Sequence, residues 1–192
     1  EVADVVLEND DLETMIVAVS HGRTIYSNIR KALHFLLSTN FSEIMVMFAA
    51  GAVGLGHPLT AIQLLWINLL SDIFPGLALA LEPPEPDVMK RPPRDPEEPI
   101  VTAADFKRLT VESAVMSAGA LGTYGYGIMK YGMGANAGTL AFHSLTLAQL
   151  LHAFSCRSEH HSIFSKERMP ANPYLNVALS ASLGLQVLTM VV

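Results

Sequence analysis

Long apolar runs alternate along this chain with short polar segments. A helix that crosses a bilayer needs about 20 predominantly apolar residues, and five runs approach or exceed that length. These runs cover residues 32–55, 59–81, 109–131, 139–156 and 173–192. The pattern therefore predicts an all-α polytopic membrane bundle of about five spans, formed by residues 25–192.

The first 24 residues have a different pattern, which is typical of a water-soluble domain. Val5–Leu7 has the character of a short buried strand, and Glu8–Asp11 that of a turn and helix N-cap. Leu12–Arg23 then predicts a helix with apolar residues on one face. We expect this helix to continue directly into the first span, so that a short α/β segment precedes the membrane domain.

The connections between the spans divide into two kinds. Residues 56–58 and 134–138 are short glycine-containing turns, so the spans that they join must be antiparallel neighbours. The segment 82–108 is long, charged and rich in proline, which makes it semi-rigid and excludes a membrane helix. The segment 157–172 is a charged loop that contains histidines.

Composition and charge support this arrangement. The 192 residues are 51% hydrophobic and only 16% charged, against about 25% charged residues in ordinary soluble domains. A net charge of −6 and the lack of a basic stripe exclude nucleic acid as a partner. The single cysteine, Cys156, excludes an internal disulfide framework.

The basic residues also predict the topology. Of the 12 Lys and Arg residues, only Lys130 lies outside residues 1–31, the 82–108 connector and the 157–172 loop. Cytoplasmic loops carry an excess of Lys and Arg, so these three segments are predicted to be cytoplasmic and the two short turns to face outward.

The second span carries the clearest chemistry. Asn68, Ser71 and Asp72 stand at positions i, i+3 and i+4, so a helix places three oxygen-bearing side chains on one face. A carboxylate at this depth is costly unless it has a functional partner. Pro75 has no N–H for the carbonyl of Ser71 and is expected to open the helix there. A simple kink, with Asp72 paired to a neighbouring helix, is the alternative.

Polar residues of two other spans can meet that face. Asn40 and Glu43 stand three residues apart in the first span, which a short turn joins to the second. In the fourth span, Gln149 and His152 are one helical turn apart. Converging oxygen atoms of these types would suit a small hard cation better than a soft metal.

Other readings of the polar residues remain open. A soft-metal site would use His152 and Cys156 with His160 and His161 of the following loop. A secondary transporter would also use broken helices at the middle of the membrane. In the third span, small residues are expected to allow close helix packing; they are Ala118, Gly119, Gly122 and Gly125.

Taken together, these motifs resemble the C-terminal membrane portion of a type II P-type cation-transporting ATPase, most similar to the calcium pumps. The resemblance runs from Ala3–Ser20 through Gly22–Asn28 and Leu65–Asp72 to Pro83–Arg94. The proline-arginine string directly after a span is the most specific of these motifs. The resemblance implies that residues 1–24 are the α/β remnant of the phosphorylation (HAD-like) domain and the start of the stalk.

The resemblance also implies a set of cation ligands. Carried over position by position, these are Asn40, Glu43, Asn68, Ser71, Asp72 and Gln149. Ser71 stands where the calcium pumps usually have Thr and keeps the hydroxyl group. Gln149 stands where two-site pumps have Glu, and this departure bears on the number and identity of the ions.

For the whole protein, the resemblance implies an ATP-driven pump that exports calcium from the cytoplasm across the plasma membrane. Pumps for sodium or potassium, or for magnesium or manganese, are the alternatives within the family. The catalytic aspartate and the sites for ATP and magnesium would lie outside these 192 residues, in an upstream part of the same protein. The expected partners are the lipid bilayer and the upstream membrane helices and cytoplasmic domains.

Overall fold

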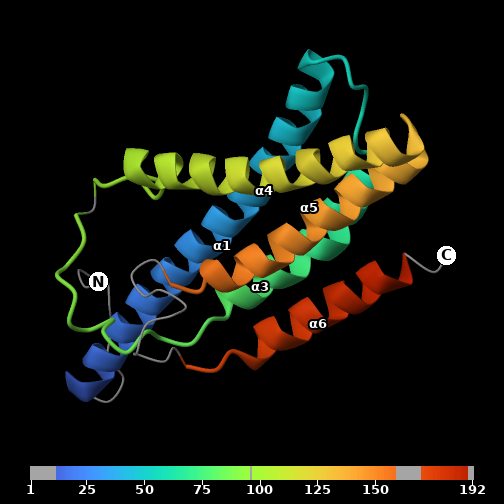
Figure 1. The fold of residues 1–192 in the computed structure, drawn as a ribbon. Coiled ribbons are helices and arrows are strands. Elements are labelled where there is room, and N and C mark those ends of the chain that lie inside the picture. The colour runs from blue at the N-terminus through green and yellow to red at the C-terminus, as the bar shows by residue number, and fades with distance from the viewer. Residues whose placement is uncertain (1–11, 96, 159–169, 190–192) are drawn as a thin grey trace.

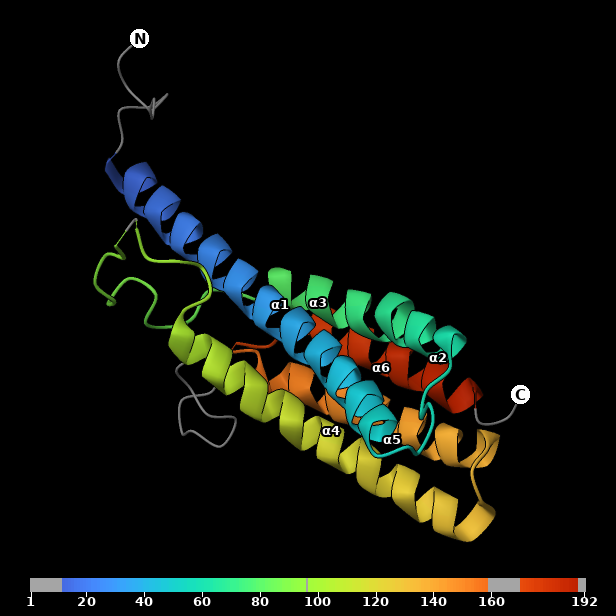
Figure 2. The same ribbon diagram turned by 90° about the horizontal axis from the view of Figure 1, so that it is seen from above.

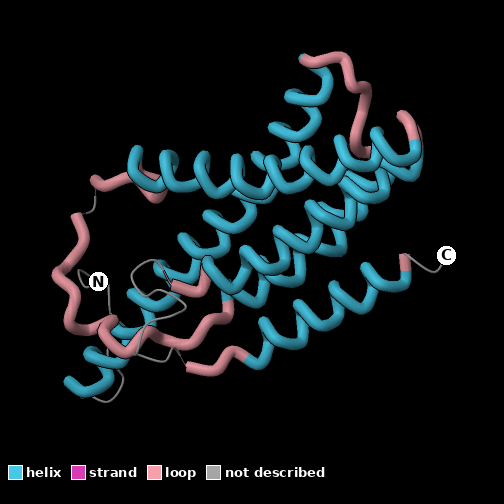
Figure 3. The backbone as a smooth tube through the Cα atoms, viewed as in Figure 1, coloured by secondary structure: helices cyan, strands magenta, loops and turns pink. Residues whose placement is uncertain are grey.

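The part of the chain that the structure describes is all helical. The computed structural model describes residues 12–95, 97–158 and 170–189, and these contain no strand (Figures 1 and 3). The expected strand at Val5–Leu7 lies outside them. The helices are α1 (Leu12–Ala52), α2 (Ala61–Trp66), the π-helix η1 (Ile67–Asp72), α3 (Ile73–Ala80), α4 (Ala103–Tyr131), α5 (Ala135–Ser155) and α6 (Pro173–Leu188).

Helix α1 is a single uninterrupted rod of 41 residues, as the sequence predicted for the passage from the soluble segment into the first span. At 1.5 Å per residue it is about 60 Å long. Its N-terminal part projects beyond the other helices, beside the loop that leads from α3 to α4 (Figure 2). Two segments, Glu13–Ala52 and Ala61–Ala80, are long and apolar enough to cross a membrane.

Local signals explain where the helices begin and end. Thr60 and Thr102 form capping boxes with Gln63 and Asp105, so each threonine satisfies a backbone N–H at the start of its helix. Asn172 caps α6, whose first residue is a proline. The turn after α1 begins within the predicted first span and contains Gly54 and Gly56, both with positive φ angles that favour glycine.

Helices α4 and α5 form a close antiparallel pair, but not through the small residues that the sequence analysis selected. Gly119, Gly122 and Gly125 have no neighbouring atom within 4 Å of the position where a Cβ would lie, so that expectation was wrong. The close approach occurs at Gly127, where a Cβ would lie 2.8 Å from the Cα of Ala137. Ala118, Gly119 and Gly122 are instead exposed, because α4 is rotated so that Met116, Ala120 and Tyr124 are buried.

The interior consists of two apolar cores. The core near the two short turns contains Val46, Ala50, Leu59, Ile67, Met116, Ala120, Tyr124, Ala137, Ala141, Phe142 and Leu145. The core near the α3–α4 connector contains Phe35, Ala78, Leu79, Leu150, Ala153, Cys156, Leu175 and Leu179. On α1, η1 and α5, a layer of buried polar side chains separates the two cores.

The exterior of the bundle is strongly apolar. Large side chains point outward from every long helix, including Phe48 at 74% exposure and Met129 at 82%. A water-soluble domain rarely exposes apolar surface of this extent, whereas a bilayer covers it. The outer surface therefore agrees with a membrane-embedded bundle.

Candidate cation site

Two carboxylates lie in the polar layer between the cores. Asp72 ends η1 and is 1% exposed, and Glu43 lies in the C-terminal half of α1 and is 6% exposed. Thr39, which precedes Glu43 by four residues on the same face of α1, hydrogen-bonds Asp72, so the two carboxylates lie at the same level of the bundle. We call the layer formed by Thr39, Ser42, Glu43, Asn68, Asp72 and Gln149 the carboxylate layer.

Asp72 is held from α1. The Thr39 hydroxyl donates a hydrogen bond of 2.7 Å to Oδ2 of Asp72. The other carboxylate oxygen, Oδ1, is buried and has no hydrogen-bond partner among the described residues. Because an ionised carboxylate accepts several bonds, this oxygen is a strong unfilled acceptor.

Glu43 is held from two other helices. Asn68 donates a hydrogen bond of 2.8 Å from Nδ2 to Oε2 of Glu43, and Gln149 approaches Oε1 with its Nε2 at 3.4 Å. The same amide nitrogen lies 3.3 Å from the carbonyl oxygen of Thr39 and from the hydroxyl of Ser42. Oε1 of Gln149 is buried and, in the described part of the chain, also lacks a hydrogen-bond partner.

The helix that carries Asn68 and Asp72 is widened. Residues Ile67–Asp72 form a π-helix, in which carbonyl groups pair with N–H groups five residues onward. Pro75 predicted an opening at the carbonyl of Ser71, and the widened turn does include Ser71, although it begins further back, at Ile67. Pro75 itself is buried within α3. Single π-helical turns occur frequently at functional sites. Here the wide turn presents Ser71 and Asp72 to the interior, both 1% exposed.

The structure brings together four of the six residues that the sequence analysis selected: Glu43, Asn68, Asp72 and Gln149. Ser71 is buried beside Asp72. Asn40 lies apart, on an exposed face of α1, where its amide donates a hydrogen bond of 2.7 Å to the carbonyl of Leu36. Its spacing of three residues from Glu43 agrees with a shared face, but the buried arc of α1 passes through Thr39 and Ser42 instead.

Thr39 and Ser42 were therefore missed. Thr39 precedes Glu43 by four residues, a spacing that places two side chains on one helix face as reliably as a spacing of three. The spacing could therefore have predicted Thr39, but the neighbouring Asn40 was chosen because its amide is a common cation ligand.

The carboxylates of the layer differ from those at the connector end in their partners. Glu82 accepts hydrogen bonds from Arg157, and Glu85 forms ion pairs with Lys31 and Arg91. Glu43 and Asp72 are held only by neutral hydroxyl and amide groups within the described residues. Two buried carboxylates with neutral donors form an electron-rich oxygen site, which favours a hard cation.

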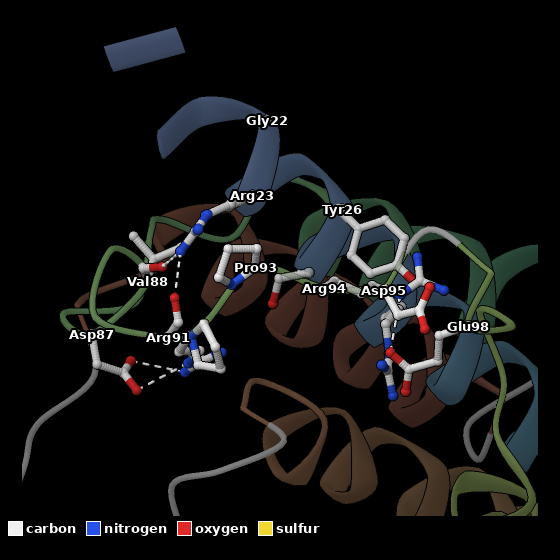
Figure 4. A pocket seen from close by; sticks show the side chains of 13 residues that line it. Gly22, Arg23, Tyr26, Asp87, Val88, Arg91, Pro93, Arg94, Asp95 and Glu98 are labelled. Atoms are coloured by element: carbon white, nitrogen blue, oxygen red, sulfur yellow. Dashed lines mark hydrogen bonds and ion pairs between the residues drawn. The ribbon is translucent and has the colours of Figure 1, made fainter. Parts of the chain in front are cut away.

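The connector between α3 and α4 binds the projecting part of α1 through hydrogen bonds and a cation–π contact. Arg23 donates to the carbonyls of Val88 and Arg91 at 3.1 and 2.7 Å. Arg94 stacks over the ring of Tyr26, with its guanidinium carbon 4.4 Å from the ring centroid. Figure 4 shows these contacts around a cavity of about 860 Å³ between α1 and the connector.

Buried pairs below this cavity fix the same junction. Lys31 of α1 lies 2.6 Å from Glu85, and both side chains are almost fully buried. Burial alone would raise the pKa of Glu85, but the hydrogen bonds and charges of Lys31 and Arg91 outweigh it and lower the pKa below 4.5. Asn28 donates to the carbonyls of Ala80 and Glu82, at the end of α3. Motion of α1 at this level must therefore move the connector.

Comparison with known proteins gives a consistent result. The family model described as "Cation transporting ATPase, C-terminus" matches residues 56–192. The whole chain is 38% identical to the calcium-transporting ATPase of Bacillus subtilis (strain 168), of which it covers 21%. A further match is 37% identical over 85% of the chain, to calcium-transporting ATPase 1 of Bacillus cereus, of which it covers 20%.

A third relative is named for a less specific cargo. Over 94% of its length the chain is 35% identical to the "Probable cation-transporting ATPase F" of Mycobacterium tuberculosis (strain ATCC 25618 / H37Rv), and it covers 20% of that protein. The chain thus spans about a fifth of the length of the curated relatives it matches.

Proposed function

This chain belongs to the cation-transporting ATPase family, as its C-terminal region, and from that premise we propose that it forms the cation-binding membrane part of an ATP-driven pump that exports calcium. The observation that carries the proposal is the carboxylate layer. Glu43 and Asp72 are buried between two apolar cores and are held by neutral groups alone among the described residues.

The chemistry of the layer favours calcium over softer metals. Every side chain that reaches it offers oxygen, and Ca²⁺ takes 6–8 oxygen ligands in flexible geometry. Oδ1 of Asp72 and Oε1 of Gln149 have no hydrogen-bond partner in the described structure and supply two such ligands. Two relatives named as calcium-transporting ATPases support the same cargo.

The charge of the layer argues for one calcium ion per cycle. Its two carboxylates balance one divalent ion, whereas two ions would bring four positive charges into a low-dielectric site. The neutral Gln149 adds no charge. An amide at this position also suits a monovalent ion, so sodium or potassium is the second candidate.

In the complete pump, we place five membrane spans in residues 32–55, 59–81, 109–131, 139–156 and 173–192, with residues 1–24 as the end of the phosphorylation domain. The connector and the residues after α5 face the cytoplasm, and the pump lies in the plasma membrane. Upstream helices of the same protein cover the exposed face of α1, on which Asn40 lies, and supply further ligands to the cation. Upstream domains supply the phosphorylated aspartate and bind ATP and magnesium.

Helix α1 links the two parts of the pump. Its N-terminal end leads to the phosphorylation domain, and its C-terminal half carries Thr39 and Glu43. The connector holds it through Arg23 and Lys31. A tilt of α1 at the cytoplasmic end therefore moves one wall of the carboxylate layer relative to Asp72.

Phosphorylation of the purified full-length pump by labelled ATP tests the cargo. We expect micromolar calcium, but not sodium, potassium, magnesium or manganese alone, to support formation of the acid-stable phosphoenzyme, and Asp72→Asn to abolish this at the same calcium concentration. Phosphorylation driven by sodium or potassium and indifferent to calcium would contradict the proposal.

A further inference from the structure

A second cluster of ligand-type side chains lies outside the carboxylate layer. His34 of α1, Glu112 of α4, and His152 and Cys156 of α5 meet near the connector end of the bundle. The ligand atoms of the two histidines and the cysteine all lie within 4.8 Å of one another. We call these four residues the histidine–cysteine cluster.

The distances within the cluster are close to those of a tetrahedral metal site. Nε2 of His152 lies 3.3 Å from Sγ of Cys156 and 3.6 Å from Oε2 of Glu112. Zinc–nitrogen bonds of about 2.0–2.1 Å and zinc–sulfur bonds of about 2.3 Å place tetrahedral ligands roughly 3.3–3.8 Å apart. Nε2 of His34 lies 2.5 Å from Oε2 of Glu112, so a metal needs these two atoms to separate by only about 1 Å.

The surroundings orient the ligands. Arg108 donates a hydrogen bond of 2.8 Å to Oε1 of Glu112, and Oε2 of the same carboxylate lies toward the histidines. The imidazole of His152 stacks on Phe35, with ring centroids 6.3 Å apart. The Ser38 hydroxyl, 2.8 Å from Nε2 of His152, has the Phe35 carbonyl as a second partner and can release the histidine. Such neighbours are what fix metal ligands in position.

The ligand types select the class of metal. A cysteine thiolate and two imidazoles suit zinc and its transition-metal relatives and are poor ligands for calcium or magnesium. A thiolate and a carboxylate together balance the charge of one dication. Cys156 and His152 also stand four residues apart on α5, one turn of a helix.

We propose that the histidine–cysteine cluster binds one zinc-class dication that is not the transported ion. The soft-metal hypothesis from the sequence paired His152 and Cys156 with His160 and His161, which lie outside the described residues. The structure instead brings His34 of α1 and Glu112 of α4 close to His152 and Cys156. His34 and Glu112 are 78 positions apart in the sequence.

A metal bound here joins α1 to α4 and α5. His34 lies on α1 about one and a half turns before Thr39, the residue that holds Asp72. Bound zinc therefore fixes the wall of the carboxylate layer that must move during transport, and it slows turnover without occupying the cargo site. This regulation goes beyond the proposed function, whereas the metal site itself does not depend on the identity of the cargo.

Cobalt binding to the purified full-length pump tests the site, with Co²⁺ itself as the probe. We expect a thiolate-to-cobalt absorption band in the near ultraviolet and d–d bands typical of four-coordination, both removed by added Zn²⁺. Cys156→Ser should remove the thiolate band, and His34→Ala should weaken Co²⁺ binding at least about 100-fold. The matched control His57→Ala, which alters an exposed histidine in the turn after α1, should leave both unchanged.

X-ray absorption of the wild-type pump loaded with one equivalent of Zn²⁺ gives an answer that needs no variant. We expect one sulfur neighbour at about 2.3 Å and nitrogen or oxygen neighbours at about 2.0–2.1 Å. Six-coordinate zinc without sulfur, or a thiolate–cobalt band that persists in Cys156→Ser, would overturn the assignment. So would Co²⁺ affinity that is the same in His34→Ala as in His57→Ala.

Discussion

At the scale of single residues, the donors around Glu43 and Asp72 matter as much as the carboxylates. Thr39 and Asn68 each hold one carboxylate oxygen and leave the other directed into the layer. A hydrogen bond to a charged group contributes about 1.5–3 kcal/mol when both partners are buried. The neutral donors therefore fix the geometry of the site without cancelling the negative charge that a cation needs.

Replacing Thr39 by Val tests this role, because valine keeps the shape of threonine and removes the hydroxyl. We expect the calcium concentration for half-maximal phosphorylation to rise about 10- to 100-fold, which corresponds to the loss of one charged hydrogen bond. Thr139→Val is the matched control, since the Thr139 hydroxyl is exposed and bonds only the carbonyl of Ala135 among the contacts described. Equal calcium dependence in the two variants would remove Thr39 from the site.

Glu85 gives the protein a predictable response to acid. Its pKa is lowered in the folded state, because the partners Lys31 and Arg91 outweigh the effect of burial. A lowered pKa stabilises the fold above the ordinary value of 4.5, and this contribution is lost as pH falls from there through the folded pKa. At pH 7, Glu85→Gln should cost about 3–5 kcal/mol, because it leaves Lys31 buried without its carboxylate partner.

Thermal unfolding of wild-type and Glu85→Gln pumps between pH 7 and pH 3 measures this effect. The difference in Tm should be largest near pH 7 and should shrink below pH 4.5. Glu97→Gln is the control, because that side chain is exposed. A difference in Tm that grows as pH falls would contradict the sign of the pKa shift.

At the scale of helices, the sequence predicted which helices form and their order better than their local geometry and packing. The apolar runs predicted the spans, because burial depends on local residue type. The caps Thr60, Thr102 and Asn172, which determine where three helices begin, were not used in that prediction. Pro75 predicted the opening at Ser71, but no local sequence signal showed that the π-helical turn extends back to Ile67. Glycine spacing in α4 likewise did not reveal which face meets α5, since packing against Ala137 decides that.

Gly127 is the position where helix packing can be tested. A Cβ there would lie 2.8 Å from Cα and 3.0 Å from Cβ of Ala137, so the backbones must separate. Overpacking of this kind costs about 1–3 kcal/mol, and we expect Gly127→Ala to lower the Tm of the pump. Gly122→Ala has open space and should be neutral or raise the Tm slightly, because alanine favours the helix. Equal melting of the two variants would contradict the packing described for α4 and α5.

At the scale of the whole molecule, α1 and the connector form one mechanical unit. Arg23, Asn28 and Lys31 attach three successive turns of α1 to residues 80–91. The same connector end includes Glu82, which also binds Arg157 and Asn172 at the ends of α5 and α6. A displacement of α1 is therefore passed to three other helices and not only along its own axis.

Inserting Gly-Gly after Tyr26 separates the soluble end of α1 from this unit. Asn28 and Lys31 keep their partners, so calcium binding should remain close to wild type, while Arg23 turns away from the connector. We expect calcium uptake into vesicles to slow at least about 10-fold, because glycine weakens the helix that carries the motion. An Ala-Ala-Ala-Ala insertion at the same place, which adds about one helical turn, should retain more transport. Equal uptake with both insertions and the wild type would exclude coupling through α1.

The most direct test of the account is equilibrium binding of labelled calcium to the purified full-length pump and to its Asp72→Asn variant. Asp72→Asn keeps the size of the side chain and removes one of the two charges in the carboxylate layer. We predict one calcium ion per phosphorylation site in the wild type and no saturable binding in the variant at the same concentrations. Unchanged binding in Asp72→Asn, or two ions bound cooperatively by the wild type, would contradict the proposed site.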